Sequence, residues 1–155
     1  MSRTRKEGEV DVGQREPAAA KEATGHIAFT ITGHVVELIW TGFIDDASIA
    51  SVPGLLEAEL VGKEVRYAIF DARPVTDYAA DSRHSGGAIL GVLKAAGVKR
   101  TWVITESGSI RMIGSAVALA VGLSMRFVAT REEAIAGIGE LDEVERKKRA
   151  RHQPD

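Results

Sequence analysis

Two serines, a histidine and an aspartate stand together in the polar loop Asp81-Ser-Arg-His-Ser-Gly86. A β-type run, Tyr67–Asp71, comes before this loop, and an apolar run beginning at Ala88 follows it. The loop is therefore predicted to lead from a buried strand into the first turn of a helix. A helix start presents unpaired backbone N–H groups and the positive end of the peptide dipoles, which together stabilise an anion. A serine there is a candidate phosphorylation switch.

The same loop, with Asp77 nearby, also suggests a serine hydrolase. A catalytic triad needs a base within hydrogen-bond reach of the nucleophile and an acid that orients the base, which adjacent residues on one loop rarely achieve. The chain also lacks the Gly-x-Ser-x-Gly turn of such enzymes. We predict no catalytic residues here and no enzyme activity.

Asp71, the pair Asp45-Asp46 and Thr105 resemble the acidic cluster of a phospho-receiver domain. Receivers, however, place a helix between their first two strands, where this chain has a short turn, Thr32-Gly33-His34. They also need a lysine after the fifth strand, where this chain has Ala129-Thr-Arg131. We therefore expect Asp45 or Asp46 to cap a helix and Asp71 to accept hydrogen bonds from loop amides.

Composition excludes several kinds of site. The chain has no cysteine, so disulfides, thiolate catalysis and cysteine-bound zinc are ruled out. Its four histidines are too scattered to suggest a metal site, and no cofactor is predicted. A net charge of −2 gives no general attraction to nucleic acid, and no apolar run is long enough to span a bilayer. No secretory signal is recognisable, so a bacterial-type cytoplasmic protein is expected.

Charge and apolar content divide the chain into three parts. Residues 1–24 mix charges with few large aliphatic side chains, and we predict a disordered leader. Residues 25–139 carry the strand and helix patterns of one domain. Residues 140–155 place acidic side chains before the basic run Arg146–Arg151, which predicts a charged C-terminal helical extension or tail.

The domain opens with two β-type runs, residues 26–31 and 35–41, which the Thr32-Gly33-His34 turn joins as an antiparallel hairpin. A helix should follow; either it begins late, capped by Ser51, or Pro53 kinks it. Strands at 65–71, 100–105 and 124–129 then alternate with helices, the last opened by the capping box of Thr130 and Glu133. The predicted fold class is α/β, a mixed sheet with an antiparallel first hairpin and parallel crossovers. The predicted core includes Ile69, Phe70, Ile89, Val103, Ile104, Val117 and Phe127.

The order of elements and the serine loop resemble a STAS domain, the fold of sulfate-transporter C-termini and anti-sigma-factor antagonists. The similarity rests on Ser85-Gly-Gly-Ala-Ile-Leu-Gly91 and on Thr130-Arg-Glu-Glu-Ala134. It implies that Ser85 takes the place of the phosphorylatable serine, although Arg83-His84 replace the family's Asp-Ser and a shifted loop would use Ser82. The chain is also similar to the STAS-like group related to Sec14-type lipid-binding folds.

The resemblance implies a non-enzymatic regulatory or scaffold module whose partner is a protein: a kinase, an anti-sigma-type regulator or a second copy. The candidate phosphorylation and partner-binding residues are Ser85, Ser82, Asp81, His84 and Gly86. We expect the Ser85 hydroxyl to be exposed, and an aspartate in its place to leave the fold intact. The glycines around it either line a phosphate-binding turn or let the helix lie close to the sheet. The alternative function is a carrier that holds a small molecule or lipid in an apolar pocket beneath the helices.

Overall fold

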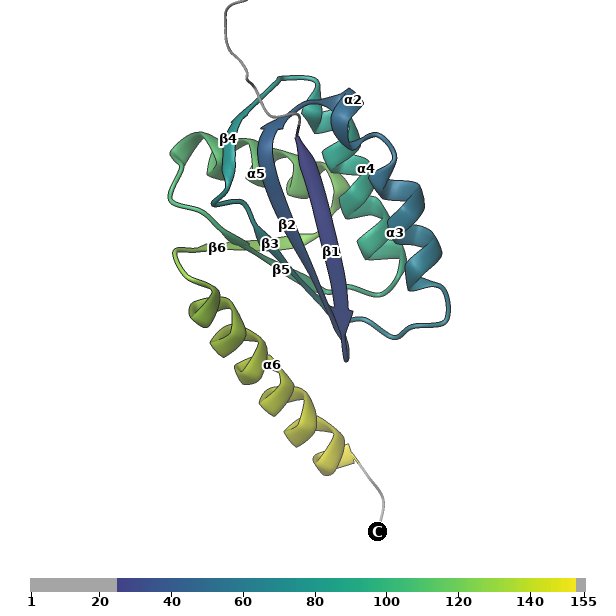
Figure 1. Ribbon diagram of the computed structural model, residues 1–155. Helices are drawn as coiled ribbons and strands as arrows, with labels where there is room; N and C mark the ends of the chain where they lie inside the picture. The colour runs from purple at the N-terminus through teal and green to yellow at the C-terminus, as the bar shows by residue number, and fades with distance from the viewer. Residues whose placement is uncertain (1–24, 153–155) are drawn as a thin grey trace, which may run out of the picture.

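The computed structural model describes residues 25–152, which form a mixed sheet with helices on both faces (Figure 1). The strands are β1 (His26–Thr32), β2 (Val35–Ile44), β3 (Tyr67–Asp71), β4 (Val75–Tyr78), β5 (Arg100–Ile104) and β6 (Ser124–Val128). Their order is β1-β2-β3-β5-β6, with β4 paired to β2 outside this path. β1 and β2 are antiparallel, and every other pair is parallel. The predicted fold class is confirmed.

One strand was missed. The segment after Asp71 was interpreted as a polar loop, yet Val75–Tyr78 forms β4 and continues the sheet beside the end of β2. β2 pairs with β3 as far as Ile39 and with β4 from Gly42 onward. Gly42 has φ 80°, a left-handed backbone conformation that suits glycine, and the register shifts beside it. The short, exposed sequence of β4 has little of the apolar alternation that identifies a strand.

The two alternatives for the helix after the hairpin both hold in part. Helix α2 (Asp46–Ile49) is a single turn, and α3 (Val52–Leu60) begins after Ser51 with Pro53 in its first turn. Asp45 caps α2 through a capping box with Ser48. The Ser48 N–H donates to Asp45 Oδ1 over 2.8 Å, and this hydrogen bond lowers the pKa of the Asp45 carboxyl.

Three strand–helix units follow, as expected. Helix α4 (Ser82–Ala95) lies between β4 and β5 in the chain, α5 (Gly108–Val121) connects β5 to β6, and α6 (Arg131–His152) follows β6. Ser107 accepts from the Ile110 N–H and caps α5. Thr130 and Glu133 exchange backbone-to-side-chain hydrogen bonds of 3.1 Å, which is the predicted capping box of α6. Helix α6 continues without interruption through residue 139, and the domain boundary proposed there stays a prediction.

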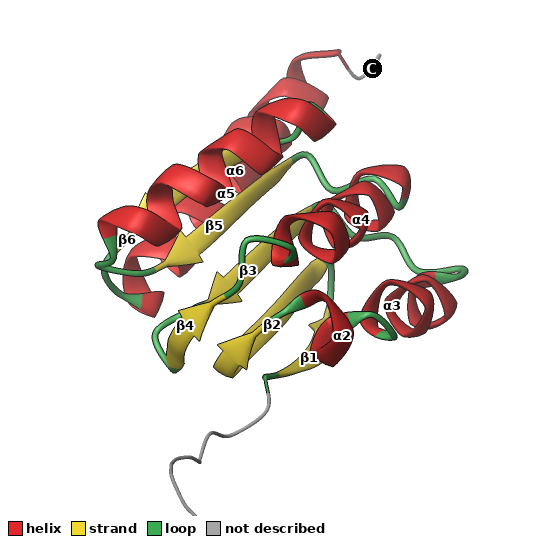
Figure 2. Ribbon diagram, turned by 90° about the horizontal axis from the view of Figure 1, so that it is seen from above, coloured by secondary structure: helices red, strands yellow, loops and turns green. Residues whose placement is uncertain are grey.

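Alternate residues of the central strands face opposite sides of the sheet. Ala68, Phe70 and Val103 pack in the larger core beneath α3, α4 and α5. Ile69, Trp102 and Ile104 pack in the smaller core with Ala134 and Ile138 of α6. Figures 1 and 2 show α3 and α4 side by side and α6 running separately along the other face.

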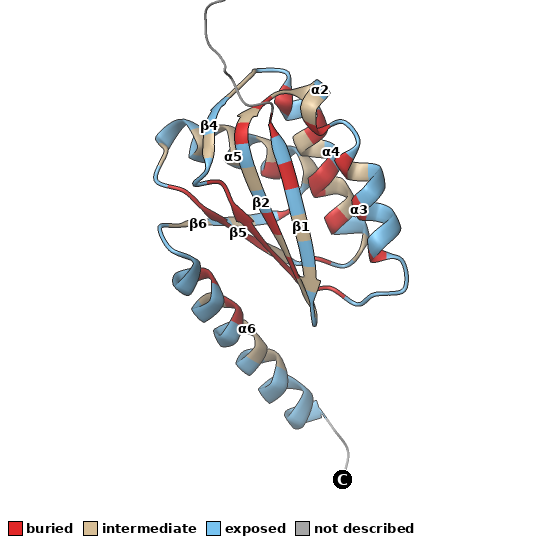
Figure 3. Ribbon diagram, viewed as in Figure 1, coloured by how far each residue is buried: buried red, intermediate tan, exposed pale blue. Residues whose placement is uncertain are grey.

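Most of the predicted core is buried. Ile69, Phe70, Ile89, Val103 and Ile104 are at most 6% exposed. Val117 and Phe127 are only partly buried, because they border the cavity described below. The exposed outer half of α6 appears in Figure 3, where burial is confined to its first turns. The predicted leader lies outside the described residues.

Candidate functional site

The first turn of α4 holds the predicted site residues. Asp81 stands at the N-cap position and Ser82 is the first helical residue. The amides here are already paired: Ser82 N–H donates to Ala79 O over 3.0 Å, and His84 N–H donates to Asp81 O over 3.1 Å. This helix start therefore has fewer unpaired donors than a regular helix end, and the expected anion site is partly filled by the chain's own backbone.

Ser85 meets a carboxylate from another helix. Its hydroxyl donates to Asp46 Oδ1 over 2.5 Å, and its backbone N–H donates to the same oxygen over 3.0 Å. Asp46 opens α2, so one carboxylate oxygen ties α2 to α4. Carboxylates favour helix N-termini because the helix dipole is positive there. Asp46 occupies the place that an external anion would take.

A second carboxylate makes the reciprocal contact. Asp81, at the start of α4, accepts a hydrogen bond from the Asp46 N–H at the start of α2 over 3.2 Å. Each of these two carboxylates therefore accepts a hydrogen bond from a backbone N–H in the first turn of the other residue's helix. The two helix starts form one hydrogen-bonded unit, which we call the α2–α4 clamp: Asp46, Asp81 and Ser85.

The expected exposure of Ser85 is wrong. Ser85 is only 4% exposed and Ser82 only 9%, whereas Arg83 and His84 between them are exposed. Successive residues of a helix point in different directions, so Ser82 and Ser85 face the protein interior while the side chains of Arg83 and His84 face solvent. A negative charge on Ser85 would lie against Asp46, and the expectation that an aspartate there leaves the fold undisturbed does not fit this contact.

Gly86 and Ser82 lie on a different side of the same turn, where they border a cavity of about 110 Å³ between α4, α5 and the sheet. A Cβ added at Gly86 would have no atom within 4 Å, and the same is true of Gly91. These two glycines are therefore not needed for close packing on the sheet. Gly86 instead leaves space open at the cavity.

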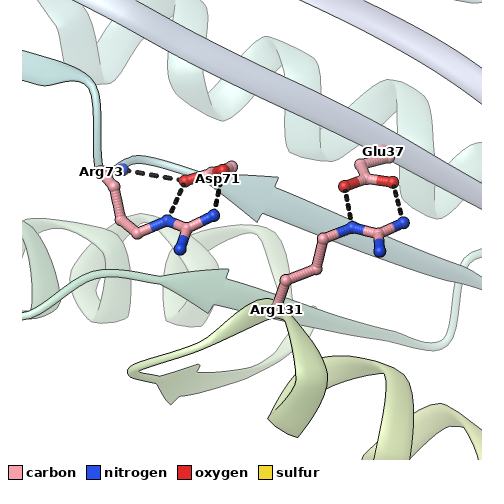
Figure 4. A network of polar contacts seen from close by, with 4 residues as sticks. All are labelled: Glu37, Asp71, Arg73 and Arg131. Atoms are coloured by element: carbon pink, nitrogen blue, oxygen red, sulfur yellow. Dashed lines mark hydrogen bonds and ion pairs between the residues drawn. The ribbon is translucent and has the colours of Figure 1, made fainter.

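A separate group of ion pairs lies where β3 ends and α6 begins (Figure 4). The Arg73 guanidinium donates two hydrogen bonds to the Asp71 carboxylate, from Nε to Oδ1 over 2.9 Å and from Nη2 to Oδ2 over 2.8 Å. The backbone N–H of Arg73 also donates to Asp71 Oδ1. The hydrogen bonds from Arg73 hold the pKa of the Asp71 carboxyl below its ordinary value. The Arg131 guanidinium likewise donates two hydrogen bonds to the carboxylate of Glu37. Asp71 is thus engaged by its own loop, as predicted, and does not stand free as a receiver aspartate would.

Within residues 25–152 no group of histidine and acidic side chains is arranged to hold a metal ion. The helices in that range are also too short or too polar to cross a membrane.

Comparison with known proteins identifies the fold. No family model matches the chain, and no curated protein matches it in sequence. Among solved structures, the unphosphorylated anti-sigma factor antagonist SpoIIAA is similar, with 18% identity and a TM-score of 0.57, over 74% of this chain and 97% of that one. The phosphorylated form of SpoIIAA, a Bacillus cell fate determinant, gives 18% identity and a TM-score of 0.52, over 73% and 99% of the two chains. The fold is STAS-like.

Sequence reasoning placed the loop correctly but missed what surrounds it. The sequence indicates Asp46 as a helix cap or as part of a receiver-like acidic pair, whereas its contact with Ser85 joins residues far apart in the chain. No local pattern reports such a contact. The sequence indicates the cavity only as the pocket of the alternative carrier, because its walls come from six separate elements: β2, β3, α4, β5, α5 and β6.

Proposed function

We propose that the protein is a non-enzymatic regulatory module whose α4 start contacts a protein partner, and that phosphorylation of Ser85 disrupts this contact. The observation that carries the proposal is the hydrogen bond from the Ser85 hydroxyl to Asp46 in a STAS-like fold. The similar protein SpoIIAA exists in unphosphorylated and phosphorylated forms, which supports a phosphorylation switch in this fold. A cytoplasmic, bacterial setting belongs to the same proposal.

The α2–α4 clamp supplies the physical mechanism. A phosphoryl group on Ser85 removes the hydroxyl donor and adds between one and two negative charges beside the Asp46 carboxylate. Like charges at that distance repel in a poorly hydrated site, so Asp46 would leave Ser85. The start of α2 would move with it. A partner that binds the exposed surface at Arg83 and His84 would then contact a new negative charge and a displaced start of α2.

Ser85 is 4% exposed, so a kinase must first open the clamp. Helix α2 is a single turn, and such short elements open at little free-energy cost compared with the whole domain. We propose that opening of α2 exposes Ser85. Ser82, which is also nearly buried, is the second candidate; it has no carboxylate contact of this kind among the described residues.

The test begins by finding the partner. A photo-crosslinking amino acid at the exposed position of His84 is placed in the full chain and activated in cells, with the same group at exposed Glu59 of α3 as the control. Proteins captured from position 84 and not from position 59 are then tested for affinity. Chains carrying phosphoserine at 85, Ser85→Ala or no change are compared.

Phosphoserine should weaken binding about tenfold or more, equivalent to roughly 1.4 kcal/mol. Ser85→Ala loses the hydroxyl but keeps the backbone N–H bond to Asp46 and adds no charge, so it should bind nearly like the unmodified chain. Ser109→Asp controls for the added charge, because it places a charge at an exposed position in the first turn of α5. Equal affinities for the phosphorylated and unmodified chains would refute the switch.

The carrier function remains the second candidate, because the cavity beneath α4 and α5 is lined mainly by apolar side chains. Its volume, about 110 Å³, is well below the roughly 300 Å³ at which typical ligand pockets begin. A whole lipid chain would therefore not fit without rearrangement. Native mass spectrometry of the chain purified without detergent decides the matter: a bound lipid would favour the carrier, and a bare chain favours the regulator.

A further inference from the structure

The cavity between α4, α5 and the sheet has an unusual chemical composition. Its walls are formed by Trp40 and Phe70 of the sheet, by Ile113 and Val117 of α5, and by other apolar residues of the larger core. The polar exceptions are Ser82 and Arg83. Among residues 25–152, Arg83 is thus the only ionisable residue that lines the cavity, and no carboxylate lines it.

The cations at this cavity are not neutralised within the described part of the chain. Arg83 is exposed, and no carboxylate among residues 25–152 forms an ion pair with it. A second guanidinium, that of Arg111, lies 6.0 Å from the ring centre of Phe127, which itself lines the cavity. By contrast, Arg73 and Arg131 on the other side of the sheet each bind a carboxylate with two hydrogen bonds. The positive charge at the cavity is available to a ligand.

The size of the cavity limits the apolar part of a ligand. An engineered apolar cavity of about 150 Å³ stays free of water and binds benzene. At about 110 Å³, this cavity holds a group of about that size or slightly smaller, such as the end of an alkyl chain. Small residues make the space: Gly86 from α4 and Gly114 from α5 both border it.

We propose that this cavity binds a medium-chain aliphatic carboxylate, with the end of its alkyl chain among the apolar walls and its carboxylate at Arg83. Burial of the methylene groups is favourable because it removes apolar surface from water, and the guanidinium fork matches a carboxylate in shape and charge. This ligand site lies outside the regulatory role proposed above and gives a ligand class to the carrier alternative, on whose cavity it rests. It needs no phosphorylation, so binding of the isolated chain to a carboxylate and the effect of phosphoserine on a partner succeed or fail separately.

The chain's two tryptophans provide a built-in probe and control. Trp40 lines the cavity, whereas Trp102 is packed against α6 on the other face of the sheet. The full chain labelled with 5-fluorotryptophan therefore gives one ¹⁹F resonance for each region, which Trp40→Phe assigns. Octanoate is titrated to millimolar concentration. The Trp40 resonance should shift with saturation, and the Trp102 resonance should stay in place.

Two sets of variants and two other probes make the test specific. Gly86→Leu should fill the cavity and reduce octanoate affinity at least tenfold. Gly91→Leu is the control on the same helix: a Cβ added at Gly91 would also meet no atom within 4 Å, but Gly91 does not line the cavity, so its affinity should stay unchanged. Arg83→Gln should reduce affinity about five- to tenfold, while Arg126→Gln on β6 should leave it unchanged. Octanol and octylammonium should bind more weakly than octanoate to the unchanged protein. The proposal is overturned if octanoate leaves the Trp40 resonance unmoved, if Gly86→Leu binds as well as Gly91→Leu, or if octylammonium binds as well as octanoate.

Discussion

The two faces of the sheet are packed in opposite ways. On the α6 face, Trp102 is 2% exposed and lies so close to Gly137 that a Cβ there would come within 2.8 Å of its indole nitrogen. The ion pairs of Glu37 with Arg131 and of Asp71 with Arg73 lie where β3 ends and α6 begins (Figure 4). On the face beneath α4 and α5, a cavity remains, and a Cβ added at Gly86 would meet no atom within 4 Å. One face is filled and fixed by charge pairs, while the other keeps room beside the candidate switch.

The contrast suggests a division of roles. The α6 face holds its helix closely against the sheet, and the α4 face, which also carries the larger core, is where a modification, partner or ligand can change the protein. Functional sites are commonly placed where packing is incomplete, since ligands and moving elements need space that a close-packed core does not provide. The predictions below test this division.

The largest effect should come from the filled face. Ile104→Ala removes a fully buried side chain from the smaller core and should lower the free energy of unfolding by about 2–5 kcal/mol. Ile113→Ala, at the cavity wall where the side chain is only partly buried, should cost clearly less. Urea unfolding of both variants measures this. An Ile104→Ala loss below about 1 kcal/mol would show that the filled face is not a tight core.

A matched pair of glycine substitutions gives the next effect, with opposite signs on the two faces. Gly137→Ala forces a methyl group against Trp102, and overpacking of this kind costs about 1–3 kcal/mol. Gly86→Ala meets nothing and should stabilise α4 by about 0.5–1 kcal/mol through helix propensity. The melting temperature should therefore fall for the first variant and rise for the second. Equal shifts would remove the distinction between the faces.

The ion pair at Asp71 should make stability depend on pH in a predictable direction. Arg73 lowers the pKa of Asp71 below its ordinary 3.8, so the pair stabilises the fold in full above that pH and loses its effect as the pH falls through the lowered value. Arg73→Gln should therefore destabilise the protein at pH 7, and the difference from the unchanged chain should shrink towards pH 2. Arg126→Gln, an exposed position outside the described ion pairs, serves as the control. A difference that is the same at both pH values would argue against the pair.

The smallest effect should come from the far end of α6. Residues 146–152 are exposed, and the ion pair of Arg146 with Glu143 lies within the helix itself. Removing residues 146–155 should change the melting temperature by less than about 4 °C, or under about 1 kcal/mol. Removing residues 140–155 should do more harm, because Asp142 accepts a hydrogen bond from His34 over 2.9 Å and pairs with Arg66. A large loss from the shorter deletion would show that the helix end contacts the domain.

The sequence predicted the elements better than it predicted the contacts between them. Apolar periodicity and caps such as Thr130 with Glu133 act over a few residues, so the hairpin and the alternating order could be inferred. The strand β4 could not, because only its end residues Val75 and Tyr78 are partly buried, which gives no alternating pattern, and it is held by pairing with β2. The candidate loop was located by its helix-start chemistry. Its key partner, Asp46, and the burial of Ser85 depend on tertiary packing that no local pattern encodes.

The central claim is that the hydroxyl of Ser85 holds α2 to α4 and that a charge there releases it. The most direct measurement is amide hydrogen exchange of the full chain with phosphoserine at position 85, compared with the unmodified chain. The account predicts faster exchange across Asp46–Ile49 in the phosphorylated chain, and unchanged exchange around Ala134 and Ile138 on the α6 face. Identical exchange of α2 in the two chains would contradict it.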